Sequence, residues 1–351
     1  DVYKRQLLTM ALAGNVQAAE IRSVGPDGEA AVDASTIELT DDQIAQIKEG
    51  GYTAAICLHY GGNDWSTSQQ KGLEDTFGEL GIEIVAVTDA NFSAETQVSN
   101  IETVMAKKPD ILVSIPTDAT ATADAYKQAA AAGIKIVFMD QRANGLEAGK
   151  DYVSVVSADN YGNGYASGTV LGDALGGKGK VAMVYYDANF APTNQRDEGF
   201  RDAMKNYPDI EIVTEQGFTD ESGCAEQGDA ILTQFPNIDG IYASWDVPME
   251  GVLSAVRAAG MEGKVTLACN DLGNNVAREI ASGNIAGGGA QMPYDQGVAE
   301  AKLAALALLG EETPSYVAVP AETVTHENVL EAYTDVYHVE TPDWLKEAYV
   351  E

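Results

Sequence analysis

Polar and aromatic residues follow several short apolar runs of this sequence, at the point where each run ends. The runs are typical of β-strands, and in open parallel sheets ligands bind at the carboxyl ends of the strands. Carboxylates and amides accept hydroxyl hydrogens, arginine donates to oxygen, and aromatic rings stack on C–H-rich faces, so this inventory suits a neutral ligand with many hydroxyl groups. The positions are His59-Tyr60, Asp140-Gln141-Arg142, Tyr186-Asp187, Ser244-Trp245-Asp246 and Asn270-Asp271.

Each of these positions also has a purely structural interpretation, which the residues alone leave open. Trp245 is suited to a hydrophobic core, and Asp271 is suited to capping the helix predicted after it. The polar residues at the other strand ends are ordinary components of loops between strands and helices.

Residues 109–142 contain one complete strand–helix–strand unit. The apolar run 111–115 lies between two prolines that are too close for a helix, so a buried strand is predicted. Thr117-Asp118 offers side-chain oxygens for a helix N-terminus, an alanine-rich helix follows to residue 132, and Gly133 ends it before a second strand at 134–139. Such a unit has parallel strands, which brings their polar ends to one edge of the sheet.

The same alternation runs along the whole chain and restarts once. Strands and helices alternate to about residue 156, and a second set begins after Ser157-Ala158-Asp159-Asn160. No linker rich in proline, serine or glycine separates the two sets. The sequence therefore predicts two doubly wound α/β domains.

Composition and motifs exclude several classes of protein. The 351 residues include 54 acidic against 21 basic side chains, a formal charge of −33, which argues against nucleic acid and anionic membranes as partners. The three cysteines form no CxxC pair, and a buried free thiol is expected for Cys57 and Cys269. The sequence has no GxSxG, P-loop, GxGxxG after a strand or HExxH, so we expect no enzyme, no cofactor and no metal.

The N-terminus indicates export. Lys4-Arg5 precedes an apolar run at 7–13 and small residues at 16–19, the pattern of a secretory signal peptide. Later apolar runs are far shorter than a membrane span. We expect a soluble, exported protein that begins with an N-terminal arm at 20–52.

Five segments in a fixed order resemble ribose-type periplasmic binding proteins, the solute receptors of sugar ABC importers. The resemblance extends from about Thr53 to about Val324. The segments are Ile115-Pro116-Thr117-Asp118, Phe138-Met139-Asp140, Ser157-Ala158-Asp159-Asn160, Gln195-Arg196-Asp197-Glu198-Gly199-Phe200 and Gln291-Met292-Pro293-Tyr294-Asp295-Gln296-Gly297.

The resemblance implies a set of ligand-binding side chains. Asp140 is expected to accept hydroxyl hydrogens, Arg196 to donate, and Trp65 to stack where the family has a phenylalanine. The arginine that follows the aspartate in the family is Gln141 here, with Arg142 one place later, and Trp245 replaces an asparagine. The complete set is Asn63, Trp65, Asp140, Gln141, Arg142, Phe190, Arg196, Trp245, Asp271 and Gln291.

The resemblance also implies three chain crossings between the lobes, at about Ala158-Asp159, Gln291-Met292 and Pro320-Ala321. The expected division is an export signal remnant at 1–19, the arm at 20–52, an N-terminal lobe of 53–158 plus 292–320, and a C-terminal lobe and tail of 159–291 plus 321–351. The fold class is α/β, with two Rossmann-like domains, a three-strand hinge and a ligand cleft between them.

The implied function is a periplasmic receptor that closes over a small monosaccharide or sugar alcohol and delivers it to an inner-membrane ABC permease, as a monomer. A pentose, a hexose, a deoxy sugar and a sugar alcohol all remain open. The alternatives are a chemotaxis receptor or a quorum-signal receptor for a furanosyl autoinducer. A sugar-processing enzyme and a sugar-responsive repressor core are less favoured, since the chain lacks catalytic motifs and a basic helix-turn-helix.

Overall fold

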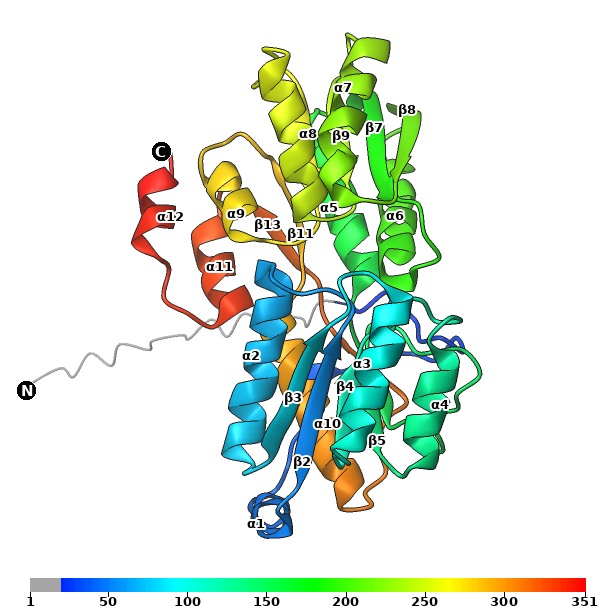
Figure 1. The fold of residues 1–351 in the computed structure, drawn as a ribbon. Coiled ribbons are helices and arrows are strands. Elements are labelled where there is room, and N and C mark those ends of the chain that lie inside the picture. Colours follow the sequence, from blue (N-terminus) through cyan, green and yellow to red (C-terminus); the bar gives the residue numbers. More distant parts are fainter. Residues whose placement is uncertain (1–19) are drawn as a thin grey trace, which may run out of the picture.

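The computed structural model describes residues 20–351, which form two lobes joined at a narrow waist (Figure 1). The predicted export signal at 1–19 lies outside the described residues. Each lobe has a central, mainly parallel sheet with helices on both faces. The predicted fold class of two doubly wound α/β lobes is confirmed.

The first lobe is built on a seven-stranded parallel sheet. Its buried strands read as continuous apolar runs because helices cover both faces. The strand order is β1-β12-β6-β5-β4-β2-β3. The bounds are β1 Val32–Asp33, β2 Thr53–Leu58, β3 Glu83–Asp89, β4 Ile111–Ser114, β5 Lys135–Met139, β6 Ser154–Ala158 and β12 Tyr316–Val319.

The second lobe is built on a six-stranded sheet whose edge strand β13 runs antiparallel to its neighbour. The other strands are parallel, in the order β13-β11-β10-β9-β7-β8. The bounds are β7 Lys178–Tyr186, β8 Asp209–Phe218, β9 Gly240–Ala243, β10 Thr266–Cys269, β11 Gly287–Ala290 and β13 Glu322–Thr325.

Helices cover both faces of each sheet and bury the core against it. In the first lobe α1, α2 and α10 share one core with the sheet, and α3 and α4 share the other. In the second lobe α5 and α6 lie on one face, with α7, α8, α9, α11 and α12 on the other. The bounds are α1 Asp41–Gly50, α2 Asp64–Glu79, α3 Ala94–Ala106, α4 Ala123–Ala131, α5 Asn160–Ala174, α6 Ala191–Met204, α7 Cys224–Gln234, α8 Asp246–Ala258, α9 Asn274–Ala281, α10 Pro293–Leu308, α11 Val329–Tyr337 and α12 Asp343–Ala348, with short 3-10 turns at Ala34–Thr36 and Glu221–Gly223.

The predicted strand–helix–strand unit is present, with one difference at the start of its helix. Asp118 accepts the backbone N–H groups of Thr120 and Ala121 at 2.8 and 2.7 Å. Its side chain therefore closes a turn, and α4 begins only at Ala123. An aspartate forms this local turn as readily as it caps a helix, so residue type alone does not distinguish the two.

Helices α2 and α10 lie side by side, although more than 200 residues separate them in sequence (Figure 1). A Cβ on Gly72 would lie 2.2 Å from the carbonyl oxygen of Tyr294, and a Cβ on Gly297 would lie 2.3 Å from that of Gln69. Glycine is required at both positions because the two backbones touch. This contact holds α10 in the first lobe.

A buried polar group lies between these two helices. Gln69 donates to Glu300 at 2.6 Å, and Gln296 lies one turn before Glu300 on α10. All three side chains are fully buried. We call Gln69, Gln296 and Glu300 the helix-pair cluster.

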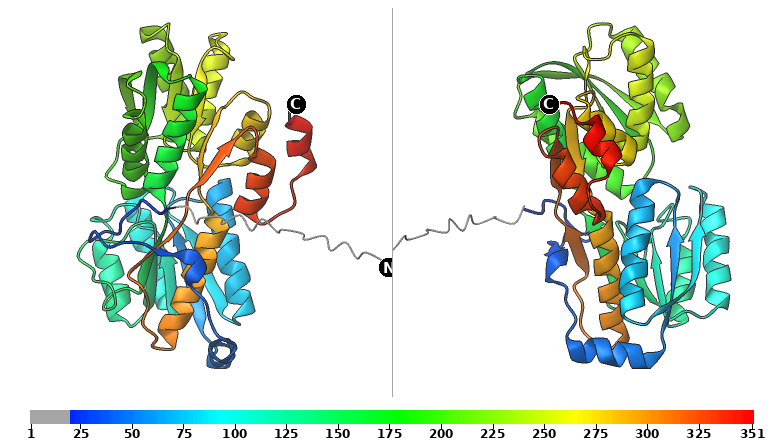
Figure 2. Two further views of the ribbon diagram at one scale, coloured as in Figure 1. Left: turned by 180° about the vertical axis from the view of Figure 1, so that it is seen from behind. Right: turned by 90° about the vertical axis from the view of Figure 1, so that its left-hand side faces the viewer.

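The chain passes between the two sheets three times, at the waist visible in both views of Figure 2. The passages follow β6 at Ala158, β11 at Ala290 and β12 at Val319. This is the predicted three-strand hinge. The residue limits assigned to the lobes, the arm and the tail stay a prediction.

The N-terminal arm is fastened to the hinge and to the first sheet. The backbone N–H groups of Arg22 and Ser23 donate to the Asp159 carboxylate at 2.9 and 2.8 Å. Asp159 also caps α5 through Gly162 N–H, and β1 pairs with β12. At the other end of the chain, His338 Nε2 lies 3.0 Å from Asp295 Oδ1, so the tail of the second lobe touches α10 of the first.

All three cysteines are free and buried. Cys57 lies on β2 and Cys269 on β10, as predicted, while Cys224 begins α7. Burial raises the pKa of the Cys57 thiol to about 11 and that of Cys224 to about 12, so the reactive thiolate is scarce near neutral pH. Across residues 20–351 no helix combines the length and apolarity needed to cross a bilayer.

Candidate functional site

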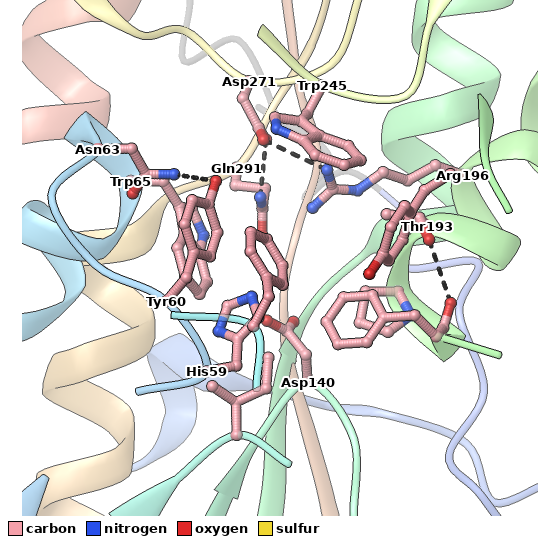
Figure 3. Close-up of a pocket in the computed structure, with 15 residues that line it drawn as sticks. His59, Tyr60, Asn63, Trp65, Asp140, Thr193, Arg196, Trp245, Asp271 and Gln291 are labelled. Atoms are coloured by element: carbon pink, nitrogen blue, oxygen red, sulfur yellow. Dashed lines mark hydrogen bonds and ion pairs between the residues drawn. The ribbon is translucent and has the colours of Figure 1, made fainter. Parts of the chain in front are cut away.

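A cavity lies between the lobes, with about 440 Å³ of space not filled by atoms, part of it open to solvent (Figure 3). Both lobes contribute to its wall, mainly from residues that follow strands or begin helices. The lining residues are His59, Tyr60, Asn63, Trp65, Phe92, Ile115, Asp140, Tyr186, Phe190, Pro192, Thr193, Arg196, Trp245, Asp271 and Gln291.

Eight of the ten predicted ligand-binding residues line this cavity. The structure does not bring the other two, Gln141 and Arg142, into it. Gln141 donates to the Pro116 carbonyl at 2.7 Å and accepts from Ala191 N–H at 3.1 Å, so its amide joins the two lobes. Arg142 forms a bidentate ion pair with Asp27 of the N-terminal arm, with N–O distances of 2.6 and 2.7 Å. Neither residue replaces the arginine that the family resemblance implied.

Asp140 stands at the end of β5 with one carboxylate oxygen held by the protein. Oδ1 accepts from Ser157 Oγ, Ala158 N, Asn160 Nδ2 and Gln296 Nε2 at 3.0, 3.2, 3.3 and 3.4 Å. Burial raises the pKa of Asp140 above its ordinary value, and Arg196, Ala158, Ser157 and Asn160 offset part of that rise. The arrangement fixes the carboxylate and leaves Oδ2 available to a ligand.

Arg196, Asp271 and Gln291 form a connected group opposite Asp140 (Figure 3). Arg196 Nη1 lies 3.2 Å from Asp271 Oδ2, and both side chains are more than nine-tenths buried. Gln291 donates to Asp271 Oδ1 at 2.7 Å. Asp271 therefore does not cap the following helix, because both of its oxygens orient cavity residues. With Asp140, these residues form what we call the hinge cluster.

Both aspartates of the hinge cluster have left-handed backbones. The φ angles are 55° at Asp140 and 71° at Asp271, a region that non-glycine residues seldom occupy. Strain of this kind persists where surrounding structure enforces it, typically at binding sites. Here it turns each carboxylate from the end of its strand toward the cavity.

The first turn of α2 supplies two further wall residues. Asn63 caps the helix by accepting Ser66 N–H at 2.8 Å, and its amide nitrogen donates to the Tyr60 hydroxyl. Trp65 follows in the first turn and is 8% exposed. The amide of Asn63 is thus used twice within the protein, and its cavity role is to orient Tyr60.

Aromatic rings from both lobes surround the outer part of the cavity. Tyr60 stacks on Phe92 with centroids 4.2 Å apart, and Tyr186 meets Trp245 edge-on at 5.6 Å. Phe92 and Tyr186 bring the two pairs together at 6.2 Å. We call Tyr60, Phe92, Tyr186 and Trp245 the aromatic collar.

His59 lies beneath the collar and is uncharged at neutral pH. Its ring stacks on Phe190 at 5.4 Å. Burial lowers the pKa of His59 to about 3, because no acidic partner offsets the cost of charging a buried imidazole. His59 and Phe190 therefore supply a flat, neutral floor.

The site residues absent from the prediction fall into two groups. His59 and Tyr60 follow the first strand directly, so the strand-end pattern already marked them. The same pattern marked Tyr186, at the end of β7, whereas Phe92, Pro192, Thr193 and Ile115 carry no comparable signal.

A second, wider cavity adjoins the first at its mouth. It spans about 1380 Å³, part of which is open to solvent, and shares Asn63 and the whole aromatic collar with the inner cavity. Its wall carries the carboxylates of Asp64, Asp220, Glu221, Asp246 and Glu250. The inner cavity thus has two unlike ends, a polar one at the hinge and an aromatic one at the mouth.

Hydrogen bonds hold the lobes together at the rim. Asp64 of α2 accepts from the backbone N–H and side-chain amide of Asn274 at 2.7 and 2.9 Å. With the Gln141 bridge, these bonds describe a closed arrangement. Between residues 20 and 351, no cluster of three or more His, Cys, Asp and Glu side chains is arranged to hold a metal ion.

A sequence profile described as a periplasmic binding protein domain matches residues 54–312. The D-ribose/D-allose-binding protein of Pseudomonas aeruginosa is 29% identical over 273 residues, covering 75% of this chain and 83% of its own. The ribose import binding protein of Salmonella typhimurium is 24% identical over 272 residues, covering 78% and 90%.

Solved structures agree with the sequence comparisons. An ABC transporter solute-binding protein from Actinobacillus succinogenes with bound D-allose superposes with a TM-score of 0.73 at 29% identity, covering 79% of this chain and 99% of that one. Another from Agrobacterium vitis, bound to α-D-tagatopyranose, gives 0.76 at 25% identity, covering 83% and 100%.

Proposed function

The chain belongs to the family of periplasmic binding protein domains, and from that premise we propose that it is the sugar-binding receptor of an ABC importer. The observation that carries the proposal is the cavity between the lobes. It combines a fixed carboxylate, an arginine and an amide with a wall of aromatic rings. Relatives and structural neighbours named for sugar binding and import support the same function.

The cavity residues have complementary roles in this proposal. Asp140 Oδ2 accepts hydroxyl hydrogens, and Arg196 donates to ring or hydroxyl oxygens. Asp271 orients Arg196 and Gln291, whose amide faces the same space. Trp65, Phe190 and Trp245 stack on the C–H faces of the sugar, and Asn63 holds the Tyr60 hydroxyl in place.

Ligand binding is coupled to closure of the lobes. Asp140 belongs to the first lobe, whereas Arg196 and Asp271 belong to the second, so only the closed form makes both sets of contacts. The ligand stabilises that form by its differential affinity for it. The closed receptor, a monomer in the periplasm, then docks on a membrane permease and releases the sugar. The protein acts by binding and carries out no reaction.

A thermal-shift screen with calorimetry on each hit tests this function. The panel contains pentoses, hexoses, deoxy sugars and sugar alcohols, each at millimolar concentration. A ligand at a hundredfold excess over its Kd stabilises the fold by about 2.7 kcal/mol, which raises the melting temperature measurably. A sugar that binds and is recovered unchanged supports the receptor. Absence of any shift across the panel, or consumption of the bound sugar, would contradict it.

A further inference from the structure

The N-terminal arm contacts both of the chain segments that hold the Asp140 carboxylate in place. The first segment, 140–142, contains that carboxylate, and the second, 157–160, supplies three of the four groups that donate to its Oδ1. The arm runs along the waist beside them (Figure 2). Because none of residues 20–52 lines the cavity, the arm can act on a ligand only through the segments that it contacts.

The contact with the second segment is buried and made at Asp159. Two backbone N–H groups of the arm and the Ser23 hydroxyl donate to the Asp159 carboxylate at 2.7 to 2.9 Å. Ser23 is 4% exposed and Asp159 is 1% exposed. Asp159 lies directly between Ala158 and Asn160, which both donate to Asp140. The arm therefore fixes the middle of the segment from which these donors come.

The contact with the first segment is the bidentate pair of Asp27 and Arg142. Val24 and Ala30 pair in a short antiparallel bridge, which closes the arm into a hairpin with Asp27 in its turn. The Asp27 N–H donates to the Glu29 carboxylate at 2.8 Å, which holds the turn in shape. A carboxylate and a guanidinium that meet through two parallel hydrogen bonds fix each other's orientation. The hairpin therefore determines where the Arg142 side chain lies.

The backbone of Asp140 requires support of this kind. Its φ of 55° is unfavourable for a residue with a side chain, and such a conformation persists only where the surrounding structure enforces it. The next residue, Gln141, is fixed by the Pro116 carbonyl and by Ala191 N–H. Arg142, one place later, is fixed by Asp27. If this end of the segment were released, Asp140 would relax toward a commoner conformation and its Oδ2 would turn from the ligand.

We propose that Asp27 and Arg142 are positioning residues for the ligand-facing carboxylate of Asp140, so that the N-terminal arm is a functional part of the binding site. The proposal rests on the proposed receptor function. It gives Arg142 a role outside the cavity, in which its guanidinium holds the segment of Asp140 from behind and makes no contact with the sugar.

Calorimetry with the sugar that gives the largest thermal shift tests the proposal. Asp27→Asn keeps the size of the side chain but removes its charge and one of its two accepting oxygens. We expect the affinity to weaken about two- to fivefold, since the pair is partly exposed, with 21% of the Arg142 side chain and 62% of the Asp27 side chain accessible. Adding Ser23→Ala removes a buried hydrogen bond to Asp159, and the combined loss should reach about tenfold.

The chain offers a matched control in a second bidentate pair. Arg201 donates to Glu215 at 3.0 and 2.6 Å, and both side chains are more than a third exposed. This pair joins α6 to β8 within the second lobe. Glu215→Gln should therefore leave the affinity for the sugar unchanged.

A double-mutant cycle distinguishes positioning from a general structural role. Asp27→Asn is measured in the wild type and in Asp140→Asn. If the arm positions the Asp140 carboxylate, Asp27→Asn should have no further effect on affinity once that carboxylate is gone. A general structural role would weaken binding by the same factor in both backgrounds.

The outcomes separate this inference from the function on which it rests. An unchanged affinity in Asp27→Asn, or an equal loss with and without the Asp140 carboxylate, overturns the role of the arm and leaves the receptor function intact. Failure of the wild type to bind any sugar overturns both. Asp27→Asn changes an exposed side chain, so it carries the test alone if the combined variant does not fold.

Discussion

Two buried polar clusters of this protein differ in the number of hydrogen-bond donors and positive charges around their acidic groups. The hinge cluster surrounds two carboxylates with an arginine and several donors. In the helix-pair cluster, Glu300 receives one hydrogen bond, from Gln69. Its Oε2 and the amide oxygens of Gln69 and Gln296 have no partner among residues 20–351. The two clusters therefore differ in how many donors and charges compensate each buried carboxyl group.

The difference has a consequence for the protonation of Glu300. Burial raises its pKa well above the ordinary value, and the charge of Asp140 raises it further. A protonated Glu300 has an O–H that can donate to one of the neighbouring amide oxygens. Burial therefore favours the neutral, protonated form of Glu300, whereas Arg196 and Asp271 of the hinge cluster lie 3.2 Å apart as an ion pair beside the cavity.

The largest effect is expected from removing the cation of the hinge cluster. Arg196→Met leaves Asp271 and Asp140 buried without a counter-charge, which should cost about 3–5 kcal/mol of stability and abolish ligand binding. Denaturant unfolding measures the loss. Arg201→Met is the control on the same helix, because its pair with Glu215 at 2.6 Å is more than a third exposed and should contribute less than about 1 kcal/mol. Equal losses of unfolding free energy in the two variants would show that the buried ion pair contributes no more to stability than the exposed one.

Replacing the carboxylate that faces the ligand should separate binding from stability. Asp140→Asn retains an oxygen that accepts from Ser157 and Ala158, but it replaces Oδ2 with an amide NH₂ group, which donates and cannot accept a hydroxyl hydrogen. We expect affinity for the sugar with the largest thermal shift to fall by about 2–3 kcal/mol, with a change below about 1 kcal/mol in unliganded stability. Unchanged affinity by calorimetry would remove Asp140 from the ligand contacts.

Glu300→Gln should stabilise the protein at neutral and alkaline pH. Below the ordinary glutamate pKa of 4.5 both the folded and unfolded chains hold the proton, so the variant gains nothing. As pH rises past 4.5, the unfolded wild type releases the proton while the folded protein keeps it, and wild-type stability falls. The gain of the variant should therefore grow as pH rises above 4.5 and level off once the folded wild type also releases the proton.

Unfolding curves from pH 4 to 8 measure that gain. Glu322→Gln on β13 is the control, because burial also raises the pKa of Glu322 but its carboxyl is partly exposed, so a smaller gain is expected. A Glu300→Gln variant that is less stable than wild type at every pH would mean that Glu300 is charged and compensated in the folded protein.

The rim contact between the lobes should have the smallest effect. Asn274→Ala removes side-chain contacts with Asp64 in a partly solvated position, where a hydrogen bond contributes about 0.5–1 kcal/mol, so affinity should weaken about two- to fivefold. Asn275→Ala is the control, since Asn275 donates to Glu250 within the second lobe at 3.0 Å. If titration calorimetry gives the same sugar affinity for both variants, the contact between Asn274 and Asp64 has no role in closure of the lobes.

The sequence alone predicted the fold and the cavity residues that directly follow strands. Alternating strands and helices predicted two α/β lobes, and the strand-end pattern identified Asp140, Trp245 and Asp271. The pattern did not reveal which neighbour of Asp140 faces the cavity. That depends on a left-handed backbone at Asp140 and on Asp27, more than 100 residues earlier, which binds Arg142.

Other parts of the site depend on contacts that no local pattern encodes. The side chain of Asn63 is used by its own helix, and Phe92 enters the cavity from a loop with a φ of 59°. The helix-pair cluster arises because Gly72 and Gly297 let two distant helices touch. Local residue types predict the elements, whereas long-range packing decides which side chains meet.

The burial of all three thiols makes this receptor a convenient starting point for a fluorescent sensor. Cys57, Cys224 and Cys269 are buried in the lobe cores, so a maleimide dye should not react with them under native conditions. One cysteine introduced on the exposed surface of each lobe would then carry a donor and an acceptor fluorophore without background labelling. Energy transfer between them would report the opening and closing of the lobes in real time.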